Sequence, residues 1–266
     1  MEVENKYELK DWDEYYSFER KIVIKPTEGF FCFYDIYLCD KILERYLPKN
    51  NNSLEKLKIC EIGCGDGKLI KKLAEKFNYE PYGIEYSKPA VSEARKRGVT
   101  VIEGNVFNKD LIKKYLKFFD IIYSYGFVEH INPPEKAIDV HLALLKDGGY
   151  FFIQIPRFKG FNYWKVRFFR PDLLNLHNLE IMEEEKLRFL CRRKDVEELF
   201  CRNYGTFKLR LPMNKKNLKY YILRVLCVFE YLLSPLFRII FSQRGFETKF
   251  FSPAVIFIRI KINHKS

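Results

Sequence analysis

Three glycines at alternate positions, Gly63, Gly65 and Gly67, stand between a run of strand-forming residues and a helical pattern. A turn this rich in glycine lets the backbone approach a ligand closely, and the helix after it offers unpaired N–H groups. The spacing G-x-G-x-G differs from the G-x-G-x-x-G of dinucleotide sites, and Lys68 and Leu69 do not complete a phosphate-binding loop. The pattern therefore favours a nucleoside cofactor over a nicotinamide dinucleotide.

Other polar residues stand at the ends of neighbouring apolar runs. Glu61 precedes the first glycine by two positions, Glu85 ends "YGIE", Asn105 follows "VIEG", and Ser124 and Tyr125 end "FDIIYSY". If these runs are parallel strands, their carboxyl ends meet at one edge of a sheet, where such sheets bind ligands. We therefore expect these side chains to surround the same ligand as the glycine turn.

The four histidines are the candidates for acid–base chemistry. His130, in "FVEHI" after the fourth apolar run, is the best placed to be a catalytic base or an acceptor ligand, and Glu129 beside it shares that position. A structural histidine that fixes the loop is the alternative. His177 could also reach the pocket, whereas His141 lies in a helical pattern and is expected at the surface.

The pattern of the chain from residue 57 alternates short apolar runs with helical segments, which predicts a mostly parallel sheet covered on both faces. The predicted strands are 57–62, 81–86, 99–104, 119–125 and 150–156, and the predicted helices are 68–77, 88–98 and 135–145. Beyond the fifth strand, 172–205 is mostly helical in pattern, while 206–212 and 253–262 are strand-like. The fold class is therefore a Rossmann-like α/β fold, with a helical lead-in and a helical, apolar C-terminal insertion.

Three regions follow from this pattern. They are a helical lead-in at 1–52, a cofactor-binding core at 53–156, and a substrate or lid region at 157–266 whose late strands complete the sheet.

The stretch "EIGCGDG", residues 61–67, resembles the first motif of the class I S-adenosylmethionine-dependent methyltransferases, acid-x-Gly-x-Gly-x-Gly. Glu85 in "YGIEYS" matches the acid at the end of that family's second strand. "FDIIYSYGFVEHI" and "LLKDGGYFFIQIP" match its fourth and fifth strands. Asn105 departs from the pattern, because the family often has Asp there, facing adenine. The resemblance covers roughly residues 57–156 and implies the cofactor S-adenosyl-L-methionine.

The resemblance also implies roles for the matched residues. Glu85 would hold the ribose hydroxyls, Asn105 and Val106 would border adenine, and Ser124 and Tyr125 would border the methionine moiety. The cofactor-binding residues that it predicts are Glu61, Gly63, Cys64, Gly65, Gly67, Glu85, Tyr86, Asn105, Val106, Ser124 and Tyr125.

The composition narrows the class of protein. The N-terminal stretch is acidic and lacks an apolar core, so it does not predict a secretory signal, and no 18-residue stretch is free of charge. Seven cysteines at irregular spacing indicate reduced thiols, and Cys60 and Cys64 have no second ligand pair nearby, so we expect no metal site. We therefore predict a cytoplasmic protein, with a peripheral position at the inner membrane face as an extension.

The apolar segment Asn217–Phe241 is the most unusual part of the sequence. On a helical wheel its charged residues, Lys219, Arg224, Glu230 and Arg238, fall along one edge, and the remainder is apolar and aromatic. We expect Pro235 to kink or split this helix. The segment could cover a lipid or lipid-linked acceptor or lie on a membrane; a core helix or a dimer face is the alternative.

These features together predict methyl transfer from S-adenosylmethionine to a small-molecule, saccharide or lipid-linked acceptor. The segment "INPPEK" resembles the Asn-Pro-Pro-aromatic motif of amino-group methyltransferases but lacks its aromatic residue and its position, which favours an oxygen acceptor. The net charge of +12 leaves an RNA methyltransferase as an alternative. A regulatory protein that binds the cofactor without catalysis is a further alternative. The oligomeric state stays open.

Overall fold

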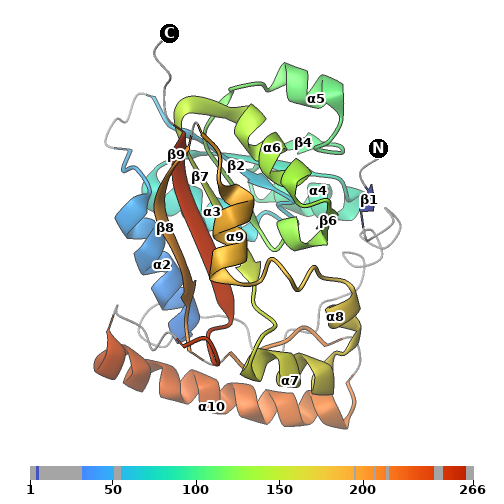
Figure 1. The fold of residues 1–266 in the computed structure, drawn as a ribbon, viewed down its shortest axis with the longest axis vertical. Helices are drawn as coiled ribbons and strands as arrows, with labels where there is room; N and C mark the ends of the chain where they lie inside the picture. The colour runs from blue at the N-terminus through green and yellow to red at the C-terminus, as the bar shows by residue number, and fades with distance from the viewer. Residues whose placement is uncertain are drawn as a thin grey trace.

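A seven-stranded sheet forms the centre of the molecule (Figure 1). The computed structural model describes residues 4–5, 32–50, 55–194, 196–206, 208–213, 216–242 and 248–261. The strand order is β4-β3-β2-β5-β7-β9-β8, in which β9 runs antiparallel to both neighbours and the other strands are parallel. The strands are β2 (Lys58–Ile62), β3 (Glu80–Glu85), β4 (Thr100–Glu103), β5 (Phe119–Tyr125), β7 (Leu145–Pro156), β8 (Val196–Tyr204) and β9 (Ala254–Lys261).

Helices cover both faces of this sheet. They are α2 (Tyr34–Tyr46), α3 (Lys68–Phe77), α4 (Lys88–Lys96), α5 (Lys109–Lys114), α6 (Glu135–Leu144), α7 (Phe161–Phe169), α8 (Asp172–Asn175), α9 (Glu184–Cys191) and α10 (Leu218–Phe241). A 3-10 turn, η1 (Val128–His130), follows β5, and the two-residue strands β1 (Glu4–Asn5) and β6 (Ile131–Asn132) pair separately.

Alternate residues of each central strand enter two different hydrophobic clusters. In β5, Ile121 and Tyr123 pack with residues of α2 and α3, whereas Ile122 packs with residues of α6 and α9. A strand buried on both faces needs apolar residues at consecutive positions, which explains the continuous apolar runs in the sequence. The predicted Rossmann-like class is confirmed, and α3 and β5 have the predicted bounds.

The sequence prediction was wrong for β8, which is the sixth strand of the sheet along the chain. β8 occupies Val196–Tyr204, inside the segment predicted to be helical, and the described residues of 206–212 form no strand. The pairing of β8 with β9 shifts register between Glu198 and Phe200, so the strict alternation of a strand is lost in its sequence. Most of the predicted lead-in, 1–52, lies outside the described residues, and the division into three regions stays a prediction.

Helix α10 lies across one end of the molecule, beside α7 (Figure 1). It is continuous from Leu218 to Phe241, so the expected split at Pro235 does not occur, and a kink there stays a prediction. In the part of the chain that the structure describes, no helix has the length and apolar character needed to cross a membrane.

Candidate active site

The glycine turn connects β2 to α3 at the carboxyl edge of the sheet. Gly63, Gly65 and Gly67 have φ angles of 70°, 55° and 75°, a region that side-chain-bearing residues rarely adopt. A Cβ atom at Gly67 would lie 2.9 Å from Ala94 Cβ on α4, and one at Gly63 would lie 3.1 Å from the Phe127 ring. Close packing adds to the backbone requirement for glycine at Gly67, whereas at Gly63 the Phe127 ring would have to shift by a few tenths of an ångström.

Glu85, at the end of β3, ties this turn to the neighbouring strand. Its carboxylate accepts hydrogen bonds of 2.8 Å from the backbone N–H groups of Gly65, Tyr86 and Ser87. Hydrogen bonds to a carboxylate are charge-assisted and short, so the arrangement fixes both the turn and the acid. The predicted proximity of Glu85 and the glycine turn is what the structure shows.

Buried polar atoms that have no hydrogen-bond partner among the described residues lie at the carboxyl ends of four adjacent strands. They are Glu61 Oε2 on β2, Ser87 Oγ after β3, Ser124 Oγ on β5 and Gln154 Oε1 on β7. Unpaired buried polar groups are rare in proteins because each costs free energy. Burial raises the pKa of Glu61 well above its ordinary range, and the nearby Glu85 carboxylate adds to the rise. This edge of the sheet is therefore suited to a polar ligand that carries positive charge.

The other predicted cofactor residues divide between core and surface. Cys64 and Val106 are buried in the hydrophobic clusters, and the Cys64 Sγ atom packs against Gly83. The Cys64 side chain is therefore part of the core, so only its backbone could face a ligand. Tyr86 and Tyr125 are exposed. Asn105 is exposed too, and its Oδ1 accepts a bond of 2.9 Å from Phe107 N–H, which closes a turn after β4.

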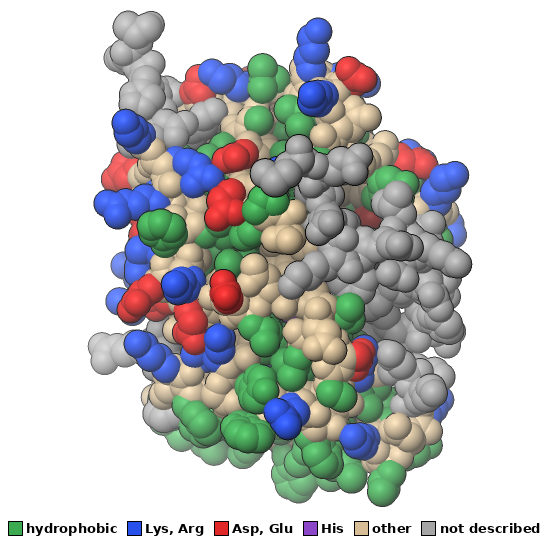
Figure 2. All heavy atoms as spheres, turned by 45° about the vertical axis from the view of Figure 1, so that its right-hand side comes forward, with side chains coloured by type: hydrophobic (Ala, Val, Ile, Leu, Met, Phe, Trp, Pro, Cys, Tyr) green, Lys and Arg blue, Asp and Glu red, His purple; other side chains and the backbone are tan. Residues whose placement is uncertain are grey.

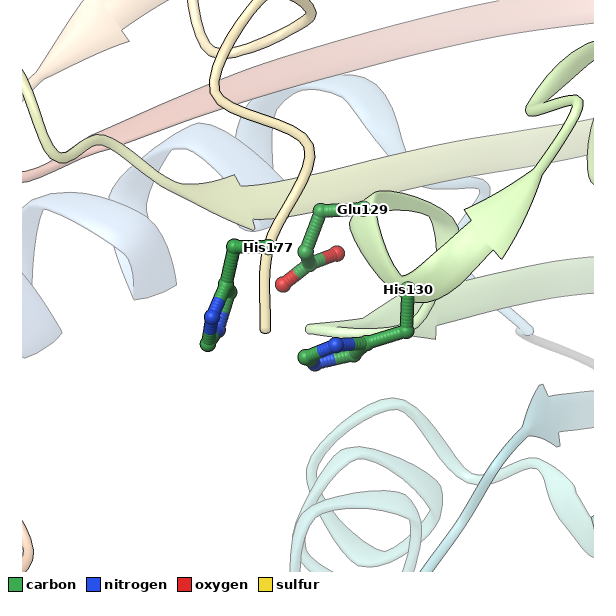
Figure 3. A group of neighbouring side chains, drawn as sticks. All are labelled: Glu129, His130 and His177. Carbon is green, nitrogen blue, oxygen red and sulfur yellow. The ribbon is translucent and has the colours of Figure 1, made fainter. Parts of the chain in front are cut away.

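A second group of side chains lies just beyond β5 (Figure 3). One potential ligand atom each from Glu129, His130 and His177 lies within 4.8 Å of the others, and Figure 3 shows the Glu129 carboxylate pointing toward the space between the two rings. The centroids of the imidazole rings are 4.4 Å apart. The fold thus brings His177 next to Glu129 and His130 of η1, as the sequence analysis allowed.

Glu129 is the most unusual member of this group. It is 1% exposed, and neither carboxylate oxygen has a hydrogen-bond partner within the described structure. Burial raises the pKa of Glu129 to about 8. A Cβ atom added at Gly126, at the end of β5, would lie 3.5 Å from Glu129 Oε1. The carboxylate is therefore held next to the carboxyl end of β5, the strand that lies beside β2 and its glycine turn.

Two hydrogen bonds, one from a side chain and one from the backbone, hold the segment after α8 against η1. His130 Nδ1 lies 2.9 Å from the Leu176 carbonyl oxygen, and Asn178 N–H donates to the Glu129 carbonyl at 2.8 Å. His177 Nδ1 lies 2.6 Å from the Leu173 carbonyl oxygen within its own segment. Two chain segments far apart in the sequence are therefore joined at the site.

His141 is not at the surface, contrary to the sequence analysis. It is fully buried on α6, where Nδ1 lies 2.6 Å from the Ala137 carbonyl oxygen, and burial lowers the pKa of its imidazole to about 4. The burial of His141 was not predictable from the sequence, because a helix with apolar residues on several sides leaves its buried face ambiguous.

Comparison with known proteins identifies the class to which this geometry belongs. A family model described as a methyltransferase domain matches residues 33–203. The ubiquinone biosynthesis O-methyltransferase of Pelagibacter ubique is 28% identical over 133 residues, 48% of this chain and 55% of that protein. The chain spans about half the length of the first curated relatives that it matches.

Many solved structures have a similar fold, and two of them serve as examples. One is a complex of a methyltransferase activator with a methyltransferase from Haloferax volcanii, with a TM-score of 0.56 and 11% identity over 86% of this chain and 91% of the other. The second is a phosphoethanolamine N-methyltransferase of Haemonchus contortus in complex with S-adenosyl-L-methionine. Its TM-score is 0.51, with 16% identity over 84% of this chain and 52% of the other.

Proposed function

Because the chain belongs to the S-adenosylmethionine-dependent methyltransferase family, we propose that this enzyme methylates an oxygen atom of a small-molecule, saccharide or lipid-linked acceptor. The position of Glu129 and His130 carries the proposal. They follow β5, the strand beside β2, and Phe127 just before them packs against Gly63 in the glycine turn. Groups able to act on a hydroxyl therefore stand next to the turn that serves the cofactor.

The residues at the sheet edge fit S-adenosylmethionine, which supplies a methyl group on a sulfonium when it is bound. In this proposal the glycine turn allows close backbone approach, and Glu85 accepts the ribose hydroxyls. Asn105 and Val106 border adenine, and Ser124 borders the methionine moiety. A cationic ligand near Glu61 would favour its ionised form, which supports a charged cofactor at this edge.

His130 is the residue that we place at the acceptor oxygen. A carbonyl oxygen only accepts hydrogen bonds, so His130 Nδ1 donates to Leu176 and would carry the proton when the ring is neutral. Its Nε2 is then the nitrogen that can take a proton from a hydroxyl. The names of the curated relatives, O-methyltransferases, support oxygen as the acceptor atom.

The test incubates the purified protein with methyl-labelled cofactor and separate lipid, saccharide, small-molecule, RNA and protein extracts. Label in an ether or ester of the first three fractions supports the proposal, and label found only in RNA or protein contradicts it. An RNA substrate would also bind with an affinity that falls steeply with salt concentration. Bound cofactor with no label in any fraction would favour a regulatory role.

Helix α10 supports a peripheral position on a membrane surface, as part of the same proposal. Its exposed apolar side chains are Leu218, Tyr221, Ile222, Val225, Val228, Phe229, Leu232, Leu233, Leu236, Ile239 and Ile240. Trp164 and Phe168 on α7 extend this surface, and Figure 2 shows hydrophobic side chains gathered at this end of the molecule. Contiguous exposed apolar surface of this kind is rare on a protein that meets only water.

The charges of α10 favour an anionic lipid surface over other partners. Its exposed charged residues are Lys219 and Arg224, both basic. Its one acid, Glu230, is 5% exposed and bonds inward to Arg210 at 3.0 Å. Arg238 also turns inward, over the Tyr37 ring at 4.2 Å. Of the four charged residues on the predicted polar edge, Lys219 and Arg224 are exposed, Arg238 is half-buried and Glu230 is buried, while the apolar face points outward.

Vesicle flotation tests this membrane position. Leu223 and Cys227 of α10 are fully buried, so deleting the helix would damage the core, and point substitutions are preferable. Phe229→Glu with Leu232→Glu changes side chains that are 58% and 60% exposed; Leu116→Glu, at 56% exposure near α5, is the matched control.

We expect the double variant to lose binding to phosphatidylglycerol vesicles about tenfold or more, because each apolar side chain contributes ~1.5–3 kcal/mol when buried. The control should bind as the wild type does. Equal binding of all three proteins, or loss of a dimer without loss of flotation, would contradict the membrane position.

A further inference from the structure

The cluster of Glu129, His130 and His177 has the composition of a metal site. Two imidazoles and one carboxylate from different segments converge within 4.8 Å, a donor set that suits zinc and neighbouring first-row divalent ions. No metal site is predicted from the sequence, because Cys60 and Cys64 lack a second ligand pair nearby, and His177 is remote in sequence from Glu129 and His130. Only the packing of the segment after α8 on η1 brings the three together.

The Glu129 carboxylate provides the independent sign of a ligand. It is nearly fully buried, has no hydrogen-bond partner in the described structure, and points toward the two rings (Figure 3). An ionised carboxylate in such surroundings is costly unless a cation or a hydrogen-bond donor accompanies it. A bound cation would supply that partner.

The hydrogen bonds of the histidines also match those of metal ligands. Each Nδ1 donates to a backbone carbonyl, His130 to Leu176 and His177 to Leu173. In metal sites the second ring nitrogen usually donates in this way, which fixes the tautomer and presents the unprotonated nitrogen to the ion. When the two rings are neutral, that nitrogen would be Nε2 on each. The Asn178 N–H bond to the Glu129 carbonyl holds the two segments in register.

We propose that Glu129, His130 and His177 bind one first-row divalent metal ion and that this ion binds the hydroxyl oxygen of the acceptor. Three protein ligands leave coordination positions open, as in catalytic metal sites. A hydroxyl bound to the ion loses its proton more readily, and the proton passes to solvent. The role of the ion at the acceptor hydroxyl rests on the proposed function. With the ion present, His130 binds the ion, and the ion in turn binds the acceptor hydroxyl.

Cobalt(II) binding to the purified full chain, after removal of metal with a chelator, tests the site directly. Absorption spectroscopy reports both stoichiometry and ligand type, because thiolate ligation by one of the seven cysteines gives an intense charge-transfer band. We expect one cobalt(II) ion per chain without that band. His177→Ala and Glu129→Gln should each weaken binding about tenfold or more. Glu103→Gln, which alters an exposed carboxylate, should change nothing.

The variants also separate this inference from the proposed function. Calorimetry with S-adenosylmethionine shows whether each variant is folded and keeps its cofactor site. Unchanged cobalt(II) affinity in both cluster variants, or a spectrum dominated by thiolate, would overturn the metal site. Transfer of methyl to oxygen at full rate in the presence of a chelator would overturn the role of the ion while leaving the proposed function intact. Metal binding without methyl transfer would overturn the proposed function and leave the metal site intact.

Discussion

Replacing Gly67 by alanine tests whether the glycine turn is required by packing in addition to backbone conformation. Gly67 has φ 75°, and an added Cβ would lie 2.9 Å from Ala94 Cβ, 3.1 Å from Ala94 Cα and 3.1 Å from Val99 Cγ2. Ordinary contacts begin at 3.4 Å, and Ala94 cannot rotate away because its Cα belongs to α4. Gly98 is a matched control: its φ is 79°, and the nearest atom to an added Cβ is Lys71 Nζ at 3.7 Å.

The two substitutions share their conformational terms. Both place a Cβ in the left-handed region, at a cost of about 1–2 kcal/mol, and both remove the flexibility of glycine from the unfolded chain. Gly67→Ala adds overpacking, which typically costs about 1–3 kcal/mol. We therefore expect Gly67→Ala to be about 1–3 kcal/mol less stable than Gly98→Ala.

Urea unfolding at 25 °C measures this difference, provided that the slopes of the two transitions agree. Calorimetry with S-adenosylmethionine should show weaker binding for Gly67→Ala and unchanged binding for Gly98→Ala, because only Gly67 belongs to the turn. Equal stabilities for the two variants would refute the argument from packing. Wild-type affinity in Gly67→Ala would refute the role of the turn in binding.

Three further predictions concern ionisable side chains in the interior. Glu85→Gln removes one carboxylate oxygen from the three N–H donors and should weaken cofactor binding about tenfold or more by calorimetry. The His141 pKa of about 4 lies below the ordinary value of 6.5, so the unfolded chain binds more protons between these values. Stability should then fall by up to ~3 kcal/mol as pH drops from about 6.5 to 4, a loss that unfolding experiments should find absent in His141→Leu. Arg210→Met leaves the half-buried Asp35 and the buried Glu230 without their shared partner and should cost about 3–5 kcal/mol in urea unfolding, which an unchanged midpoint would contradict.

The glycine turn shows how well local signals predict structure. Alternating glycines, the apolar run before them and the helical period after them act over a few residues, and both α3 and the link from the turn to Glu85 follow from them. β8 shows where such signals fail. Its register shift removes the alternation that identifies a strand, so only pairing with β9 decides its conformation.

Helix α10 shows the same limit at a larger scale. The sequence indicates that this segment is a long amphipathic helix. Which side faces the protein depends on the buried bonds of Glu230 to Arg210, and of Arg210 to Asp35 on α2. No helical wheel contains those partners, because they belong to other segments of the chain.

The sequence by itself determined the Rossmann-like class, the glycine turn and the acid at the end of β3, since each depends on neighbours along the chain. The tertiary structure alone decided that His177 joins Glu129 and His130, that His141 is buried, and that α10 presents its apolar side outward. These features depend on contacts between segments tens of residues apart, where burial and charge pairing outweigh any local preference.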